Sequence, residues 1–122
     1  MARIRHVAIK CEDQERTADF YKQTFGLAEV WRGPVRDDGN RAIYLSDGHI
    51  NLAILPARGE PEGINHFGFQ VEDVEQTLEV AGAAGAKGEG EKKPRDGRFA
   101  EMGVHDPAGT LVDVSVKGWK LQ

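Results

Sequence analysis

Four polar side chains in this sequence are of types that bind metal ions or hydrogen-bond a substrate, and they share one local pattern. Each is followed two positions later by Ala, Gly or Ser, and the four are His6, Asn51, His66 and Asp113. Because side chains two positions apart lie on the same face of a strand, each polar group would lie beside a gap. The pattern predicts a concave sheet with these four residues around an open cavity.

Two stretches sixty residues apart indicate an internal duplication. At an offset of 60, six residues of the second stretch repeat residues of the first: Ile4/Ile64, His6/His66, Glu12/Glu72, Asp13/Asp73, Glu15/Glu75 and Thr17/Thr77. Further along, residues 49–54 match residues 111–116 at an offset of 62, which predicts that Asn51 is the counterpart of Asp113. The chain therefore contains two copies of one module.

The hydrophobic pattern of each copy predicts a strand followed by a helix and further strands, which is an α+β fold. The helices are predicted to begin at Asp13 and Asp73, which are N-cap residues, and the first is predicted to end at Gly26. Strands are predicted at residues 3–11, 27–32, 41–45, 49–55, 64–70, 99–104 and 110–116, and a mobile loop at residues 87–98. We expect one domain over residues 1–122, with module 1 at 1–55, a linker at 56–63 and module 2 at 64–122.

Composition excludes several functional classes. The 122 residues include 16 Lys and Arg against 20 Asp and Glu, and the net charge of −4 argues against general nucleic-acid binding. Cys11 is the single cysteine, which excludes a disulfide framework and favours a reducing compartment. Because no segment has the pattern of a signal peptide or a membrane span, we expect a cytoplasmic protein that binds neither nucleic acid nor a membrane.

Three motifs, together with the repeat, resemble the vicinal oxygen chelate superfamily. They are D-F-Y-x-x-x-F-G-L at residues 19–27, N-H-F-G-F at residues 65–69 and D-P-A-G-T-L-V-D at residues 106–113. This superfamily includes glyoxalase I, methylmalonyl-CoA epimerase, fosfomycin-resistance enzymes, extradiol dioxygenases and bleomycin-resistance proteins. The resemblance implies two βαβββ modules that form a half-open mixed-sheet barrel around a divalent metal. It leaves the reaction open, because this superfamily hosts many chemistries.

The resemblance also implies a ligand set. The histidines of the opening strands fall on His6 and His66, and the acid of the last strand falls on Asp113. Where glyoxalase-like relatives carry Glu or Gln in the first module, this sequence has Asn51, which is shorter and neutral. Two imidazoles, a carboxylate and an amide oxygen suit Zn²⁺, Ni²⁺, Mn²⁺ or Fe²⁺. Asp113 is also the predicted catalytic residue, as the group that moves a proton.

Two leading classes of function and one weaker class follow. The first is a metal-dependent isomerase, epimerase or lyase of the glyoxalase type, with an Fe²⁺ dioxygenase as a variant. The second is a metal-free protein of the bleomycin-resistance type that sequesters a small molecule; a ferredoxin-like regulatory domain is a third class, but it leaves the four polar residues unexplained. In both leading cases we expect a homodimer and a small-molecule ligand.

Other residues near the predicted cavity have weaker signals. His49 and His105 are candidates for groups that contact the metal ligands or the substrate, although each is more typical of a surface residue. Basic residues in or near the two long loops would suit an anionic substrate: Arg32, Arg36, Arg41, Lys92, Lys93, Arg95 and Arg98.

Overall fold

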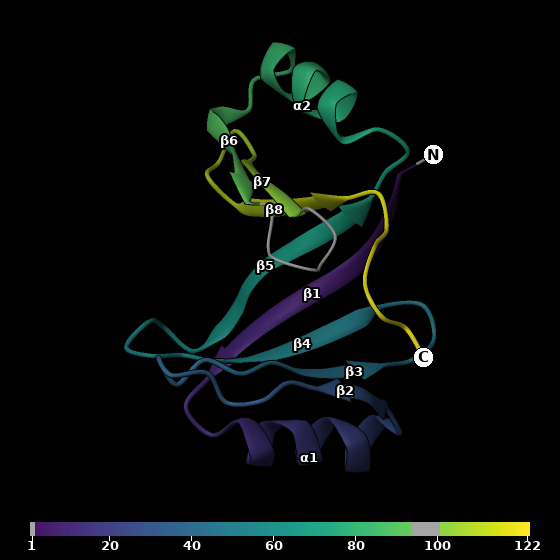
Figure 1. Cartoon of the computed structure of the whole chain (residues 1–122), viewed down its shortest axis with the longest axis vertical. Helices are drawn as coiled ribbons and strands as arrows, with labels where there is room; N and C mark the ends of the chain where they lie inside the picture. Colours follow the sequence, from purple (N-terminus) through teal and green to yellow (C-terminus); the bar gives the residue numbers. More distant parts are fainter. Residues whose placement is uncertain (1, 94–100) are drawn as a thin grey trace. The chain divides into compact units, whose positions relative to one another are not determined.

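The computed structural model describes residues 2–93 and 101–122, which form two compact units (Figure 1). The first unit contains His6–Asn65 and Lys120–Gln122, and the second unit contains Met1–Arg5 and His66–Trp119. Each unit therefore corresponds to one copy of the repeat, apart from a few residues at the start of each copy and at the end of the chain.

The first unit has the predicted succession of strand, helix and three strands. Its elements are β1 (Arg3–Cys11), α1 (Gln14–Phe25), β2 (Ala28–Arg32), β3 (Ile43–Ser46) and β4 (Asn51–Pro56). The strands lie in the order β2-β3-β4-β1, where β1 is parallel to β4 and the other neighbours are antiparallel. Figure 1 shows α1 along one face of these strands.

The second unit repeats this arrangement. Its elements are β5 (Gly63–Gln70), α2 (Val74–Ala83), β6 (Lys87–Lys93), β7 (Glu101–His105) and β8 (Leu111–Ser115). The strands lie in the order β5-β8-β7-β6, and the opening strand β5 is again parallel to the last strand, β8. The predicted fold class, α+β with two βαβββ modules, is confirmed.

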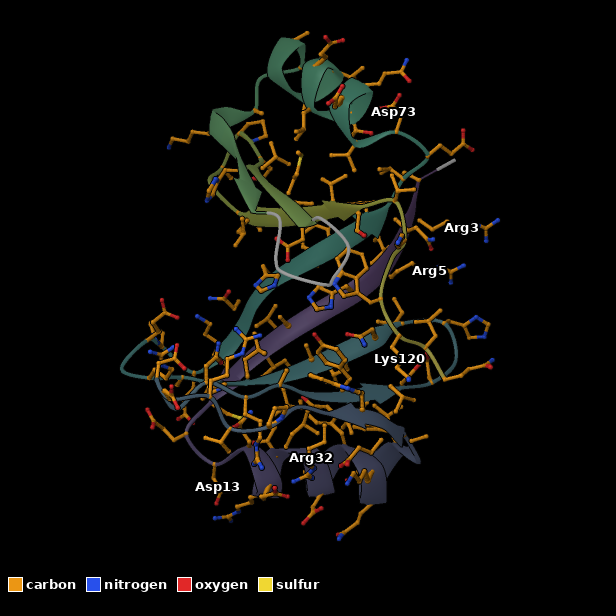
Figure 2. All side chains as sticks on the ribbon, viewed as in Figure 1. Arg3, Arg5, Asp13, Arg32, Asp73 and Lys120 are labelled. Carbon is orange, nitrogen blue, oxygen red and sulfur yellow. The ribbon has the colours of Figure 1, made fainter. Side chains whose placement is uncertain are left out.

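Both helices begin at the predicted aspartates, which Figure 2 labels. The Asp13 carboxylate accepts a hydrogen bond from the backbone N–H of Arg16, and the Asp73 carboxylate accepts one from Gln76, each at 3.0 Å. Such bonds satisfy backbone donors that the first helical turn leaves unpaired. α1 ends at Gly26, whose φ of 72° is in the left-handed region that glycine adopts without strain.

The core of the first unit lies between α1 and the apolar face of its sheet. Ile43, Leu45 and Ile54 of the sheet are fully buried, and so is Ala18 of α1. Cys11 belongs to the same cluster, and burial raises the pKa of its thiol. The opposite face of this sheet is consequently left for polar and aromatic side chains.

One predicted element is wrong. Residues 87–98 were expected to form a mobile loop, because they are rich in glycine and charge, but residues 87–93 form strand β6. The backbone of β6 pairs antiparallel with β7, so that Lys92 faces Met102 and Lys93 faces Glu101. Main-chain pairing needs no apolar side chains, which explains why the hydrophobic pattern missed this strand. Residues 94–98 lie outside the described residues.

The module boundaries of the sequence prediction remain a prediction, although β4 ends at Pro56 and β5 begins at Gly63. Neither helix within residues 2–93 and 101–122 is long and apolar enough to cross a membrane.

Candidate functional site

The second unit brings two of the four predicted residues together. Nε2 of His66 lies 3.1 Å from Oδ2 of Asp113, and both side chains are only slightly exposed, at 12% and 13%. His66 is on β5 and Asp113 is on the neighbouring parallel strand β8. The pair therefore rests on backbone pairing between two strands of one unit.

Glycines flank the acid of this pair. Asp113 is opposite Gly68 on β5 and opposite Gly103 on β7, so both neighbours in the sheet lack a side chain. A Cβ atom at Gly103 would lie 3.8 Å from Oδ1 of Asp113 and 3.1 Å from Cδ1 of Leu111. Asp113 thus has a glycine on each neighbouring strand, although Leu111 lies close to the position that a Cβ atom at Gly103 would take.

The first unit pairs the other two predicted residues. Nδ1 of His6 donates a hydrogen bond to Oδ1 of Asn51 at 3.0 Å, and Nδ2 of Asn51 donates one to the backbone oxygen of Lys120 at 2.8 Å. His6 is 4% exposed and Asn51 is fully buried. Figure 2 labels Lys120, in the last residues of the chain, which belong to the same unit.

Matching aspartate turns position the two last strands. Oδ1 of Asp47 accepts hydrogen bonds from the backbone N–H groups of His49 and Ile50, just before β4. The Ile50 bond, followed by the His49 bond, lowers the pKa of the Asp47 carboxyl. Oδ1 of Asp106 accepts similar bonds from the backbone N–H groups of Ala108 and Thr110, two and four residues further on, just before β8. Each turn fixes the start of the strand that carries Asn51 or Asp113.

The strand registers show that Asn51 and Asp113 are not equivalent. On β4, Asn51 is directly opposite His6, and Ala53 is opposite Ala8. On β8, Asp113 is opposite Gly68, which corresponds to Ala8 at the offset of 60. The predicted alignment of the last strands at an offset of 62 is therefore wrong, and the offset of 60 that relates the opening strands also relates the last strands. The first-module counterpart of Asp113 is Ala53.

Aromatic side chains occupy the first unit where the second has glycine. Tyr44 of β3 is opposite Ala53, in the place that Gly103 takes beside Asp113. Its ring lies against Trp31 of β2, with centroids 5.0 Å apart. Trp31 and Tyr44 both lie on the face of the sheet that carries Ala53.

The two other candidate histidines differ in their exposure. His49 is exposed, as expected of a surface histidine. His105 is half-buried on β7, two residues after Gly103, and therefore shares the face that carries Asp113. The sequence offered no signal for this placement beyond the strand alternation itself.

The basic residues of the first long loop are mostly used within the fold. Arg32 forms ion pairs with Glu15 and Glu29, and Arg41 pairs with Glu15. Hydrogen bonds from Arg32 and then Lys22 lower the pKa of Glu29 to about 2. Arg36 is exposed. The side chains of the other predicted basic residues, Lys92, Lys93, Arg95 and Arg98, lie outside the described part of the structure.

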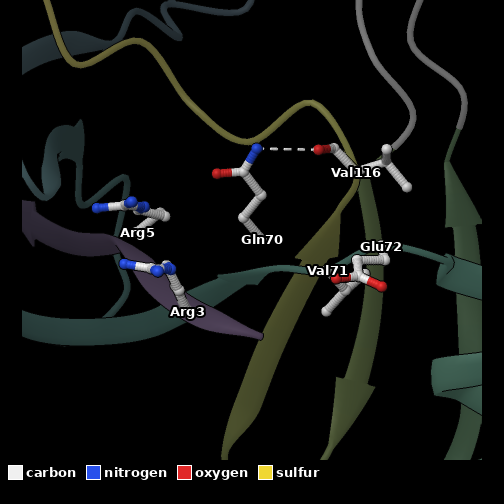
Figure 3. Close-up of a pocket in the computed structure, with 6 residues that line it drawn as sticks. All are labelled: Arg3, Arg5, Gln70, Val71, Glu72 and Val116. Atoms are coloured by element: carbon white, nitrogen blue, oxygen red, sulfur yellow. Dashed lines mark hydrogen bonds between the residues drawn. The ribbon is translucent and has the colours of Figure 1, made fainter. Parts of the chain in front are cut away.

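The second unit also contains a cavity of about 320 Å³, shown in Figure 3. Its lining residues are Arg3, Arg5, Gln70, Val71, Glu72 and Val116. Gln70 is held at the edge of the cavity by a hydrogen bond of 3.0 Å from Nε2 to the backbone oxygen of Val116. Arg3 and Arg5 are at odd positions of β1, whereas His6 is at an even one, so the cavity and His6 belong to opposite faces of that strand.

Comparisons with known proteins agree with this fold. A protein named "Probable lactoylglutathione lyase, chloroplastic" of Arabidopsis thaliana is 25% identical over 126 residues, covering 95% of this chain and 36% of that protein. The chain thus spans about a third of the length of this relative. A hypothetical protein from Bacillus halodurans C-125 has a TM-score of 0.79 at 16% identity, covering 99% of this chain and 98% of the other.

A methylmalonyl-CoA epimerase from Mycobacterium tuberculosis has a TM-score of 0.73 at 16% identity, covering 92% of this chain and 85% of the other. At these identities the structural likeness establishes the fold. The family described as Glyoxalase/Bleomycin resistance protein/Dioxygenase superfamily matches residues 3–114, which is nearly the whole chain. The chain therefore belongs to the glyoxalase/bleomycin resistance protein/dioxygenase superfamily.

Proposed function

We infer that this protein is a metal-dependent enzyme of the isomerase, epimerase or lyase type, acting on a small substrate that presents oxygen atoms to a divalent ion. The observation that carries this inference is the pair formed by His66 and Asp113, slightly exposed between two glycines. The names of the relatives, a lactoylglutathione lyase and a methylmalonyl-CoA epimerase, support the same class.

The geometry of this pair fits a shared metal ion. Two ligand atoms at right angles, each about 2.1 Å from an ion, are about 3.0 Å apart. Nε2 of His66 and Oδ2 of Asp113 are 3.1 Å apart, which matches one edge of such a coordination shell. An imidazole and a carboxylate suit Zn²⁺, Ni²⁺, Mn²⁺ and Fe²⁺ alike.

His6 is the proposed third ligand, because it occupies in the first module the position of His66 in the second. The proposal includes both ways of assembling the set, within one chain or across a homodimer. Asn51 remains the predicted fourth ligand, but its hydrogen bonds support the different role argued below. A divalent ion held by these residues would act as a Lewis acid that stabilises an oxyanion of the substrate.

Asp113 is the proposed catalytic residue. Its Oδ2 faces His66, whereas Oδ1 lies near the space that Gly103 leaves without a side chain. A carboxylate that is slightly exposed, as this one is, can accept a proton from a substrate or return it. His105 shares this face and is the nearest candidate for a group that contacts the substrate.

The test is the metal content of purified, untagged protein, measured by elemental mass spectrometry. We expect a stoichiometric divalent metal in the wild type and its loss in His66→Ala, because removal of one ligand leaves the set incomplete. His49→Ala is the matched control, since His49 is exposed and should not affect the metal. Equal metal content in wild type and His66→Ala would refute the proposal.

One observation favours the metal-free alternative. Ala53 occupies in the first module the position that Asp113 has in the second. The first module therefore has no carboxylate at this position to bind a metal together with His6. If no metal binds after reloading with Zn²⁺, Ni²⁺, Mn²⁺ and anaerobic Fe²⁺, a sequestering protein becomes the better conclusion. Ligand-induced increases in melting temperature would then be unaffected by a chelator. Iron in the protein with oxygen uptake on a catechol would instead indicate a dioxygenase.

A further inference from the structure

We propose that Asn51 is a positioning residue that fixes the proton of His6 on Nδ1 and so presents Nε2 as the ligand atom. This inference rests on the proposed metal site, but it concerns Asn51 and His6, which belong to one unit. It assigns to Asn51 a different role from that of the metal ligand expected at this point of the sequence.

The orientation of the Asn51 amide follows from its second hydrogen bond. Nδ2 of Asn51 lies 2.8 Å from the backbone oxygen of Lys120, which can only accept. If the amide were turned over, two oxygen atoms would face each other at this distance in a fully buried place. An unsatisfied buried pair of this kind is strongly unfavourable, so Oδ1 must face His6.

The state of the His6 ring follows in turn. Oδ1 of Asn51 can only accept, so Nδ1 of His6, at 3.0 Å, must carry the proton. In a neutral imidazole the other nitrogen, Nε2, then carries the lone pair that a metal ion requires. Metal-binding histidines commonly have their second nitrogen held in this way, with the tautomer and ring orientation fixed before the ion arrives.

The strand register explains why Asn51 has this role. Asn51 is directly opposite His6 on the parallel strand β4, and its amide meets the Nδ1 side of the ring. In the second unit, Asp113 is opposite Gly68, two positions beyond His66, and its carboxylate meets Nε2. Relative to its histidine, Asp113 therefore lies two positions further along the strand than Asn51 does. Asn51 contacts Nδ1 and orients the ring of His6, whereas Asp113 contacts Nε2 of His66, the nitrogen proposed to bind the metal.

The first experiment determines the tautomer of His6 in the metal-free protein. Long-range ¹H–¹⁵N correlation spectra of ¹⁵N-histidine-labelled protein, in mildly alkaline buffer, distinguish a proton on Nδ1 from one on Nε2. We expect the proton on Nδ1 in the wild type, because Oδ1 of Asn51 can only accept. In Asn51→Leu, which has no acceptor, we expect the Nδ1 tautomer to lose its dominance.

The second experiment measures Zn²⁺ affinity by competition with a chromophoric chelator. We expect Asn51→Leu to bind Zn²⁺ roughly 10- to 100-fold more weakly than the wild type, the range typical of lost outer-shell partners. His49→Ala, which removes an exposed histidine, should bind Zn²⁺ as the wild type does.

A wild-type His6 with its proton on Nε2 would overturn the inference, and this measurement requires no variant to fold. An unchanged Zn²⁺ affinity in Asn51→Leu would overturn it as well. Failure of the proposed function gives a different pattern: the Nδ1 tautomer would be present, but the wild type would bind no metal.

Discussion

The two modules carry the same fold but different chemistry at equivalent positions. In the second, Asp113 has glycine on both neighbouring strands and lies beside Nε2 of His66. In the first, the equivalent position is Ala53, with Tyr44 next to it. The second module therefore has a slightly exposed acid at this position, whereas the first provides a histidine hydrogen-bonded to Asn51 and an aromatic surface.

This difference indicates how a duplicated module can divide its tasks. A buried histidine with fixed hydrogen bonds is well suited to binding an ion, but it leaves no group to move a proton. A slightly exposed carboxylate between glycines can do both. The first module also uses its charged residues for stability, since Arg32 joins Glu15 of α1 to Glu29 of β2.

The largest expected effect comes from removing the negative charge of Asp113 in the second module. Asp113→Asn keeps the size of the side chain but replaces the carboxylate with a neutral amide. We expect a loss of metal affinity of more than roughly 100-fold, because even outer-shell partners contribute 10- to 100-fold. Chelator competition measures this, with His49→Ala as the unaffected control. An affinity within a few-fold of the wild type would show that the two modules do not differ in this respect.

The converse change introduces a carboxylate into the first module at the position equivalent to Asp113. Ala53→Asp places a carboxylate where the second module has Asp113, two positions along the sheet from His6. We expect metal affinity to rise about tenfold, while the metal-free protein loses about 2 kcal/mol of stability because the new charge is buried. Ala53→Asn is the matched control without charge. If the metal affinity does not rise, a carboxylate at position 53 does not contribute to metal binding as Asp113 does, although the strand registers make the two positions equivalent.

A smaller effect is expected from filling the space beside Asp113. A Cβ atom at Gly103 would already approach Leu111 to 3.1 Å, so Gly103→Val should cost about 1–2 kcal/mol of stability. The metal should remain bound. Acetohydroxamate, a chelator with two oxygens, should bind the metal-loaded protein about tenfold more weakly because the new methyl groups crowd it, and a tenfold change corresponds to about 1.4 kcal/mol of binding free energy. Gly82→Ala on α2, with open space around it, serves as the control. Unchanged binding would show that the glycine gap does not admit a ligand.

The smallest effect concerns the ion pairs of the first module. The folded pKa of Glu29, about 2, is below its ordinary value of 4.5, so the ion pairs stabilise the protein fully above about pH 4.5 and lose their effect as pH falls through about 2. Because these groups are partly exposed, Glu29→Gln should cost about 1 kcal/mol at neutral pH and leave metal binding unchanged. Urea unfolding at several pH values measures this, with Glu79→Gln on the exposed side of α2 as control. A loss of stability that persists unchanged at pH 2 would contradict the assignment.

Much of the fold could be predicted from local signals. Asp13, Asp73 and Gly26 mark helix ends because their side chains or backbone freedom satisfy the groups that a helix leaves unpaired. Strand alternation correctly placed His66 and Asp113 on one face. Strand β6 was missed because its pairing with β7 depends on the backbone, and the place of His105 became apparent only from the observed register of β7.

By itself, the sequence determined the duplication, the order of the elements other than β6, and the four polar positions, since these depend on residue identity and on the periods of helix and strand. Only the tertiary structure decided which residue of the first module corresponds to Asp113. Strand side chains alternate with a period of two, so a shift of two residues leaves every side chain on its predicted face. Alignments at offsets of 60 and 62 are therefore equally compatible with the hydrophobic pattern. The hydrogen-bonded registers of β1 with β4 and of β5 with β8 select the first, and with it the different roles of Asn51 and Asp113.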